Sequence, residues 1–246
     1  MRVLILGGTT EASAIALALA GDVRFAPVLS LAGRTRAPAA PPIPWRIGGF
    51  GGVAGLAAYL RQEGVAALID ATHPFAARMK QNAVQAAAEA DVPRVTVLRP
   101  AWQPEAGDRW IAAATMADAF AALGPTPRRV FLTVGQKELS PFHGPHRYLV
   151  RSVDPPAILP PNATLITARG PFAAAAEQAL LVAHGIEIVV SKNAGGSATE
   201  GKLTAARALG LPVVMVARPA PPEGPLVPDA AAALAWLEHQ RARRGV

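Results

Sequence analysis

The sequence contains no cysteine, and this absence alone removes several kinds of chemistry. Disulfides, thiolate zinc sites, iron–sulfur clusters and cysteine nucleophiles are all excluded. Histidine is also scarce, with 5 residues in a chain of 246, and no two of them have the spacing of a metal site. We therefore expect no metal centre.

Long apolar runs are missing as well. No stretch approaches the length that spans a bilayer, and Met1 leads directly into a short strand pattern without the layout of a signal peptide. We therefore expect a soluble, cytoplasmic protein that makes no membrane contact.

Lysine is rare, so the net charge of +7 comes mainly from arginine. The basic residues are dispersed, apart from a small cluster at the C-terminus. Aromatic side chains do not alternate with them as they would on a platform for single-stranded nucleic acid. The pattern argues against nucleic acid as a partner and leaves a small polyanionic substrate.

What the chain does contain is a regular alternation of apolar strand patterns and helical patterns. In the first half we expect strands near 2–6, 25–29, 45–47, 66–71 and 94–98. In the second half we expect strands near 110–113, 129–134, 148–153, 164–168, 187–191 and 213–216. Such alternation predicts an α/β protein with two Rossmann-like, doubly wound halves, mainly parallel sheets and a ligand cleft between the halves. We place the first domain at 1–100 and the second at 101–246, and we expect the proline-rich stretch 219–228 to be a loop or linker.

The first strand runs directly into Gly7 and Gly8, and a helical pattern begins with Thr9 and Thr10. Glycines remove the Cβ atoms that would block a diphosphate. The first turn of a helix supplies unpaired N–H groups and the positive end of the helix dipole. The order therefore predicts a nucleotide site. Because the full Gly-x-Gly-x-x-Gly fingerprint is absent, a simple tight turn is the alternative.

The second strand ends at Ser30, about where an NAD-binding protein carries an acid for the ribose 2′-hydroxyl. No acid stands there. Ser30 and the guanidinium groups of Arg34 and Arg36 suit a 2′-phosphate instead, because arginine can donate two hydrogen bonds to one anion. The segment predicts NADP rather than NAD, and a solvated basic loop is the alternative.

Two further loops fall at the ends of expected strands in the first half. The glycine cluster 48–52, with Gly49 and Gly51, permits close approach of backbone to a ligand, although a flexible loop gives the same pattern. Thr72, His73 and Pro74 follow the next strand, at the sheet edge where open α/β proteins bind ligands. A lone histidine is more often structural than catalytic, and both roles stay open for His73.

In the second half, three loops also follow expected strands and therefore converge on one sheet edge. Their basic and polar residues suit the carboxylates of a substrate, while each residue taken singly also fits a surface charge. The candidate substrate-binding residues are Lys137, Arg169, Lys192, Asn193, Gly196 and Lys202.

Six strings in order carry a resemblance that spans almost the whole chain. They are ILGGTTEA at 5–12, SLAGRT at 30–35, GGFGG at 48–52, DATHPFA at 70–76, RGPF at 169–172, and KNAGG at 192–196 followed by Lys202. Together they resemble the precorrin-6A reductase family of cobalamin biosynthesis, within porphyrin-type metabolism. The resemblance implies an NADPH-dependent oxidoreductase that reduces one double bond of a tetrapyrrole polycarboxylate and gives precorrin-6B.

On this interpretation the basic loops of the second half hold the substrate. NADPH is held by the residues predicted above for the first half, which are Gly7, Gly8, Thr9, Thr10, Ser30, Arg34, Gly49, Gly51, Thr72, His73 and Pro74. Other enzymes of the corrin pathway are candidate partners. The reaction also needs a proton, for which His73, Lys192, Lys202 and solvent are equal candidates. No catalytic acid is identified.

Three alternatives stay open. One is a related reductase that acts on the cobalt-containing precursor with NADH. Another is a lyase resembling uroporphyrinogen-III synthase, which has similar halves and needs no nucleotide. The last is a nucleotide-sensing module, which would leave the basic loops of the second half without a role.

Overall fold

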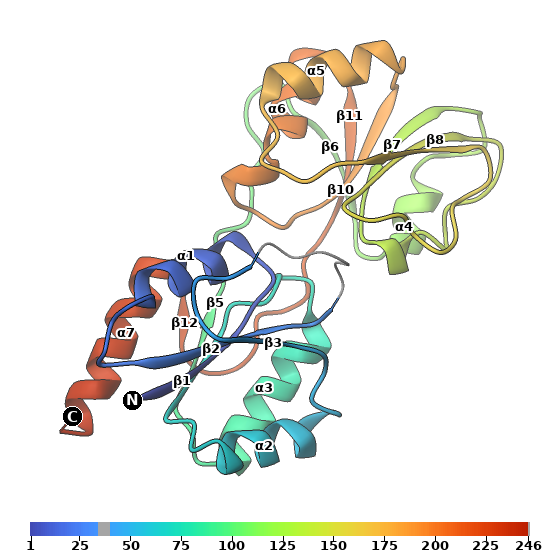
Figure 1. Ribbon diagram of the computed structural model, residues 1–246. Coiled ribbons are helices and arrows are strands. Elements are labelled where there is room, and N and C mark those ends of the chain that lie inside the picture. Colours follow the sequence, from blue (N-terminus) through green and yellow to red (C-terminus); the bar gives the residue numbers. More distant parts are fainter. Residues whose placement is uncertain (34–39, 246) are drawn as a thin grey trace. The chain divides into compact units, whose positions relative to one another are not determined.

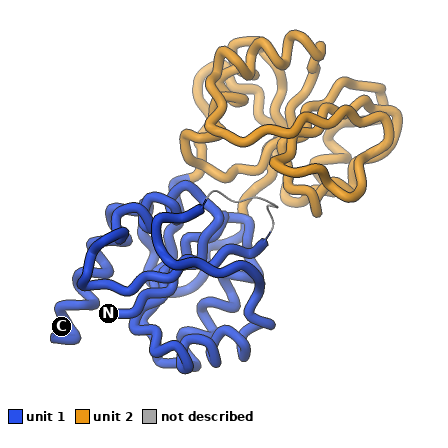
Figure 2. The backbone as a smooth tube through the Cα atoms, viewed as in Figure 1, with its two compact units in different colours: residues 1–100, 219–246 blue, residues 101–218 orange. Residues whose placement is uncertain are grey.

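The computed structural model describes residues 1–33 and 40–245. The chain forms two compact units, coloured separately in Figure 2. Unit 1 contains residues 1–100 and 219–246, and unit 2 contains residues 101–218. Within the described residues, no helix is long and apolar enough to cross a membrane.

Unit 1 is built on a six-stranded sheet in which every neighbouring pair is parallel, in the order β12-β5-β4-β1-β2-β3. Its strands are β1 (Arg2–Leu6), β2 (Ala26–Leu31), β3 (Trp45–Ile47), β4 (Ala67–Asp70), β5 (Arg94–Val97) and β12 (Leu226–Val227). Its helices are α1 (Thr10–Leu19), α2 (Val53–Gln62), α3 (Ala77–Glu89) and α7 (Ala230–Arg243). Helices lie on both faces of the sheet (Figure 1).

The central strand β1 is buried on both faces, as its short apolar sequence predicts. Successive side chains of a strand point to opposite faces. Val3 and Ile5 accordingly pack with α1 and α7, while Leu4 and Leu6 pack with α2 and α3. These two apolar layers fix β1 in the middle of the unit, so the loop that follows it lies at the centre of the sheet edge.

Unit 2 repeats this plan. Its six-stranded parallel sheet has the order β6-β11-β10-β7-β8-β9. The strands are β6 (Arg109–Ala113), β7 (Arg129–Thr133), β8 (Arg147–Ser152), β9 (Ala163–Thr167), β10 (Ile188–Lys192) and β11 (Pro212–Val216). The helices are α4 (Met116–Ala121), α5 (Ala174–Ala183) and α6 (Gly201–Ala208), with single 3₁₀ turns η1 (Gln136–Glu138) and η2 (Ser197–Thr199).

The prediction of two Rossmann-like halves with parallel sheets is confirmed. The structure differs from the sequence prediction at the C-terminal end, because residues 219–246 belong to unit 1 and not to the second domain. The stretch expected to be a linker contains β12, which pairs in parallel with β5. Helix α7 then buries Ala233 and Leu237 completely against the core of unit 1. Apolar burial therefore fixes this segment in unit 1.

One edge strand of each sheet, β12 in unit 1 and β6 in unit 2, shows how the two units share one chain. β6 stands beside β11 at the same place in its sheet that β12 takes beside β5. β6 precedes the other strands of unit 2, whereas β12 follows the whole of unit 2. The chain therefore passes from one unit to the other twice, before β6 and again before β12.

We expect a buried histidine to make the stability of unit 2 depend on pH. His146 is fully buried, with its ring centroid 6.1 Å from that of Phe120 and 5.9 Å from that of Tyr148. Burial lowers the pKa of His146 below its ordinary value of 6.5, and the charge of Arg128 lowers it further. The folded unit therefore keeps the ring neutral.

We expect the free energy of unfolding to fall as the pH drops below about 6.5. Below that pH the unfolded chain binds a proton at His146 that the folded unit does not bind, so protonation favours unfolding. His146→Leu should remove this contribution. Urea unfolding of both proteins, followed by circular dichroism over a pH series, checks the expectation. An unchanged pH dependence in His146→Leu would contradict it.

Candidate functional site

The carboxyl edge of the unit 1 sheet contains a point at which the strand order reverses. The chain leaves β1 toward β2 and β3, and then returns to the other side of β1 to form β4 and β5. Ligands of open α/β sheets bind in the crevice at such a reversal. A shallow pocket lies here, and Thr9, Thr72, Pro74 and Arg99 are among its lining residues. The Thr9 hydroxyl joins the two loops, since its Oγ1 donates to the carbonyl oxygen of Ala71 at 2.7 Å.

Gly7 and Gly8, which follow β1, are glycines for two different structural reasons. A Cβ on Gly7 would lie 2.6 Å from Cδ1 of Leu29, so the β2 side chain would have to shift to accommodate one. Gly8 has φ +108°, a backbone conformation that favours glycine, and a Cβ there would meet no atom of the described residues within 4 Å. Among these residues, Gly8 therefore faces open space directly before the helix.

Helix α1 begins at Thr10, and Thr9 is its N-cap. The side chain of Thr9 accepts a hydrogen bond from the N–H of Ala12 at 3.2 Å. The cap fixes the direction of the helix, whose first-turn N–H groups and positive dipole end lie at the carboxyl edge of β1. The predicted strand–glycine–helix order is thus present. The hydroxyl of Thr9 makes its hydrogen bonds within the protein, with the carbonyl oxygen of Ala71 and the N–H of Ala12.

An ion pair stands at the same helix end. Arg99 Nη1 lies 3.0 Å from Oε2 of Glu11 in the first turn of α1. Partial burial alone would raise the pKa of Glu11, but a hydrogen bond from its own backbone and the charge of Arg99 outweigh burial and lower the pKa. Glu11 is therefore ionised and balanced by Arg99. Sequence analysis did not single out either residue.

Arg46 is the most informative residue that sequence analysis missed. It stands opposite Ser30 in the β2–β3 pairing, and its Nη1 donates to Ser30 Oγ at 2.8 Å. Nη1 also donates to the carbonyl oxygen of Gly48, and Nη2 donates to that of Gly49. These three hydrogen bonds between described residues use part of a guanidinium that has five N–H donors. A cation is thus fixed beside Ser30, at the predicted ribose position.

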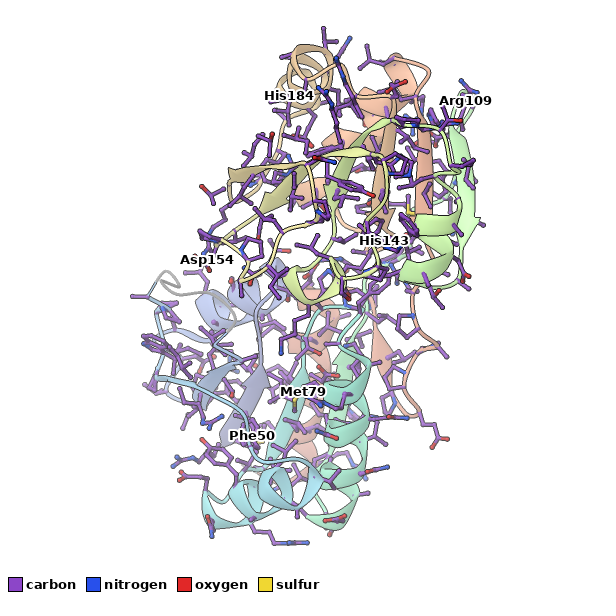
Figure 3. The ribbon with its side chains drawn as sticks, turned by 90° about the vertical axis from the view of Figure 1, so that its right-hand side faces the viewer. Phe50, Met79, Arg109, His143, Asp154 and His184 are labelled. Carbon is purple, nitrogen blue, oxygen red and sulfur yellow. The ribbon has the colours of Figure 1, made fainter. Side chains whose placement is uncertain are left out.

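The glycine loop after β3 surrounds this arginine. The Arg46 guanidinium carbon lies 4.1 Å from the ring centroid of Phe50, whose side chain is labelled in Figure 3. Phe50 in turn packs edge-on against Tyr59 of α2. A Cβ on Gly49 or Gly51 would meet no atom within 4 Å in the part of the chain that the structure describes. The loop therefore combines an anchored aromatic ring with glycines that have room beside them.

Arg34 and Arg36 lie outside the described residues. The prediction that Arg34 holds a 2′-phosphate therefore stays a prediction. Arg46 supplies a described guanidinium in the middle of the neighbouring strand β3, and the pairing register of β2 and β3 is the signal that would have identified it.

The loop after β4 is held from within the unit. The N–H and hydroxyl of Thr72 donate to Oδ1 of Asp70 at 3.0 and 2.6 Å, and the buried Lys80 Nζ lies 3.3 Å from Oδ2 of the same carboxylate. The Nδ1 atom of His73 accepts a hydrogen bond from the N–H of Phe75 at 3.2 Å. This bond assigns the proton of the neutral ring to Nε2. Pro74 is buried and lines the pocket.

At the carboxyl edge of unit 2, the predicted substrate residues fall into two groups. Lys137 on η1 and Arg169 after β9 are exposed. Lys192, at the end of β10, is largely buried and forms an ion pair with Glu138, with Nζ 2.7 Å from Oε2. Glu138 Oε2 also accepts from the N–H of Gly135 at 2.7 Å. One carboxylate of the protein thus joins the loops after β7 and β10.

Asn193, Gly196 and Lys202 gather around Trp102. The Asn193 side chain accepts from the Trp102 N–H at 2.8 Å and donates to the Trp102 carbonyl at 3.0 Å. The indole N–H donates to the carbonyl of Gly196. Lys202 is buried, with its Nζ 4.8 Å from a Trp102 ring centroid and 2.7 Å from the carbonyl oxygen of Thr199. These contacts shape the loop after β10.

A buried ion pair supports the loop that carries Arg169. Arg151 donates to both carboxylate oxygens of Glu177, at 2.5 and 2.8 Å, and its guanidinium carbon lies 3.6 Å from the ring centroid of Phe172. The N–H of Phe172 donates to the carbonyl of Ala198 at 3.0 Å. The loops after β9 and β10 are therefore joined through Phe172.

Comparison with known proteins connects this arrangement to one family. The family model described as Precorrin-6x reductase CbiJ/CobK matches residues 2–238. The precorrin-6A reductase of Rhodobacter capsulatus is 50% identical over 250 residues, which cover 100% of this chain and 99% of the relative. The cobalt-precorrin-6A reductase of Priestia megaterium is 30% identical over 177 residues, covering 65% of this chain and 68% of that protein.

A solved structure of CobK precorrin-6A reductase has the same fold. It superimposes with a TM-score of 0.91 at 49% sequence identity, covering 98% of this chain and 97% of that structure. The match includes both units, and the family model covers nearly all of the sequence. This chain therefore belongs to the precorrin-6x reductase family.

Proposed function

We propose that this protein reduces precorrin-6A to precorrin-6B in cobalamin biosynthesis, with NADPH as the hydride donor. The observation that carries the proposal is the carboxyl edge of unit 1. There a glycine turn and a helix N-terminus lie at the reversal of strand order, and a fixed arginine on β3 lies further along the same sheet, within a chain that belongs to a reductase family.

The glycine turn fits a diphosphate. Gly8 faces open space, and the first-turn N–H groups of α1 follow it directly. Anions bind at such helix ends because the N–H groups and the dipole both favour negative charge. We therefore assign the diphosphate to the segment from Gly7 to Thr10, through its backbone.

The Ser30–Arg46 pair fits the 2′-phosphate that distinguishes NADPH from NADH. The Ser30 hydroxyl and the Arg46 guanidinium offer a fixed polar group and a cation at the end of β2, where the ribose binds in such folds. Phe50 under the guanidinium restricts its movement. Preference for NADPH follows from this cation, with Arg34 as the second candidate.

The chemistry is the transfer of a hydride and a proton to one double bond of the macrocycle. NADPH, when bound, supplies the hydride and becomes NADP⁺, so the protein mainly has to align the reactants. We place the nicotinamide beside the loop from Thr72 to Pro74, where Thr72 and Pro74 line the pocket and the neutral ring of His73 carries its proton on Nε2. His73, Lys192, Lys202 and solvent remain the candidate proton sources.

The substrate carries many carboxylates, which suits the basic edge of unit 2. We assign carboxylate contacts first to Lys137 and Arg169, because both side chains are exposed on loops at the carboxyl ends of strands. Lys192, Asn193, Gly196 and Lys202 remain predicted substrate residues. Their contacts with Glu138 and Trp102 show that they also shape the loop.

Direct reduction is the test of this function. The protein is mixed with precorrin-6A and NADPH carrying deuterium on the transferable position, while the absorbance of the reduced nicotinamide is followed. We expect the absorbance to fall and the deuterium to appear in the macrocycle by mass spectrometry. Unchanged absorbance with intact substrate would contradict the proposal.

Gly8→Ala should abolish tight NADPH binding. The added Cβ projects into the space assigned to the diphosphate and also forces a non-glycine residue to positive φ, at a cost of about 1–3 kcal/mol of stability. Gly21→Ala is the matched control, since Gly21 also has positive φ and open space but follows α1, at the opposite end of that helix. Fluorescence titration with NADPH and thermal unfolding compare the two. Equal NADPH affinities would show that Gly8 serves only the turn.

Arg46→Gln should weaken NADPH binding by about tenfold or more and leave NADH binding nearly unchanged, because only NADPH carries the 2′-phosphate. Arg61→Gln, on α2 in the same unit, controls for loss of an arginine. Titrations with both cofactors measure the effect, and Arg34→Ala is compared in the same way. An equal loss of affinity for both cofactors in Arg46→Gln would show that Arg46 only stabilises the loop.

Lys137→Met and Arg169→Met should each raise the Michaelis constant for precorrin-6A and leave NADPH affinity unchanged. Added salt should raise the wild-type constant in the same direction by screening the attraction. Arg109→Met removes a charge at the start of β6, at the other edge of the sheet, and is the control. Steady-state kinetics at several salt concentrations check this. Michaelis constants equal to that of Arg109→Met would contradict the carboxylate assignment.

A further inference from the structure

We propose that Asp70 and Lys80 act as a positioning pair that sets the backbone of Thr72, and with it the nicotinamide side of the cofactor site. The proposal rests on the proposed function, because it assigns the loop after β4 to the cofactor. It concerns residues that neither donate to the ligand nor react.

The pair holds Thr72 through three of its atoms. Asp70 Oδ1 accepts from the N–H of Thr72 at 3.0 Å and from its hydroxyl at 2.6 Å. Lys80 Nζ donates to the carbonyl oxygen of Thr72 at 3.2 Å and also to Asp70 Oδ2 at 3.3 Å. The N–H, the hydroxyl and the carbonyl of one residue are therefore all fixed by a single ion pair.

The position of Thr72 makes this control relevant to the ligand. Thr72 and its neighbour Pro74 line the pocket at the reversal of strand order. Ala71, just before it, accepts the hydrogen bond from Thr9 at the start of α1. A change in the backbone of Thr72 would therefore move the wall of the pocket that is joined to Thr9 through Ala71.

Packing alone does not account for the pair. Asp70 is 0% exposed and Lys80 is 3% exposed, and the other buried residues of α3 are all alanines. Burial lowers the pKa of Lys80, and the nearby carboxylate of Asp70 opposes that shift. Because two buried charges are costly compared with apolar side chains of similar size, their geometry points to a specific task.

The opposite side of the Asp70 carboxylate is also anchored. Thr96 Oγ1 of β5 donates to Oδ2 of Asp70 at 3.4 Å, and Arg94 donates to Thr96 Oγ1. Arg94 also donates to the carbonyl oxygen of Glu223, in the segment before β12. The carboxylate is thus fixed by β5 on one side and directs Thr72 on the other.

A purely structural pair and a positioning pair predict different results in a double variant. Lys80→Met and Asp70→Asn each remove one member of the buried ion pair and should lower the melting temperature. The double variant Asp70→Asn/Lys80→Met removes both charges and should recover most of that loss. It still lacks the donor to the Thr72 carbonyl.

The experiment therefore measures NADPH affinity, melting temperature and hydrogen exchange in the two single variants, the double variant and Leu60→Ala. Leu60 is fully buried among α2 and α3, so its truncation destabilises the same unit without touching the pair. Titrations are made well below each melting temperature. Exchange is followed at the backbone amides of residues 72, 73, 75 and 76, because Pro74 has no N–H.

We expect Lys80→Met and the double variant to bind NADPH about tenfold more weakly and to exchange residues 72–76 faster. Leu60→Ala should have a lower melting temperature but keep the wild-type NADPH affinity and exchange rates. The proposal is overturned if NADPH affinity returns together with the melting temperature in the double variant, or if exchange at 72–76 is unchanged. If the wild-type protein binds no NADPH, the proposed function fails, and the exchange data still decide whether the pair positions Thr72.

Discussion

The parallel direction of all strands in each sheet is the constraint on which the candidate site depends. Parallel strands need crossover helices, so each strand of a sheet begins at one edge and ends at the other. Every loop that follows a strand in unit 1 therefore leaves from the same edge, whatever its distance along the chain. Gly8, Ser30, Arg46 and Thr72 meet there for this reason, and the reversal of strand order leaves the crevice between β1 and β4.

Charge at these edges is mostly balanced by the protein itself. Glu11 with Arg99, Asp70 with Lys80, and Glu138 with Lys192 form ion pairs within single units. Arg46 differs, because its described partners are a hydroxyl, two carbonyl oxygens and aromatic rings, and none of these neutralises its charge. A fixed cation of this kind suits an anionic ligand group, and it supports the assignment of the 2′-phosphate.

Much of this architecture could be predicted from the sequence. The apolar runs and glycine turns placed most strands within a few residues, and the six strings indicated the family that the comparisons show. That family excludes the lyase alternative. The two-residue strand β12 was missed because so short a segment, within a proline-rich stretch, has no periodicity. Arg46 and Lys80 were missed because their importance depends on strand register and on burial, which a single sequence does not display.

A crystal structure of the protein with NADP⁺ bound would test these assignments most directly. We expect a diphosphate against the backbone from Gly7 to Thr10, and a 2′-phosphate within hydrogen-bonding distance of Arg46 and Ser30. The nicotinamide should lie beside the loop from Thr72 to Pro74. A nucleotide bound at the carboxyl edge of unit 2, or one in unit 1 with its 2′-phosphate remote from both Arg46 and Arg34, would contradict the account.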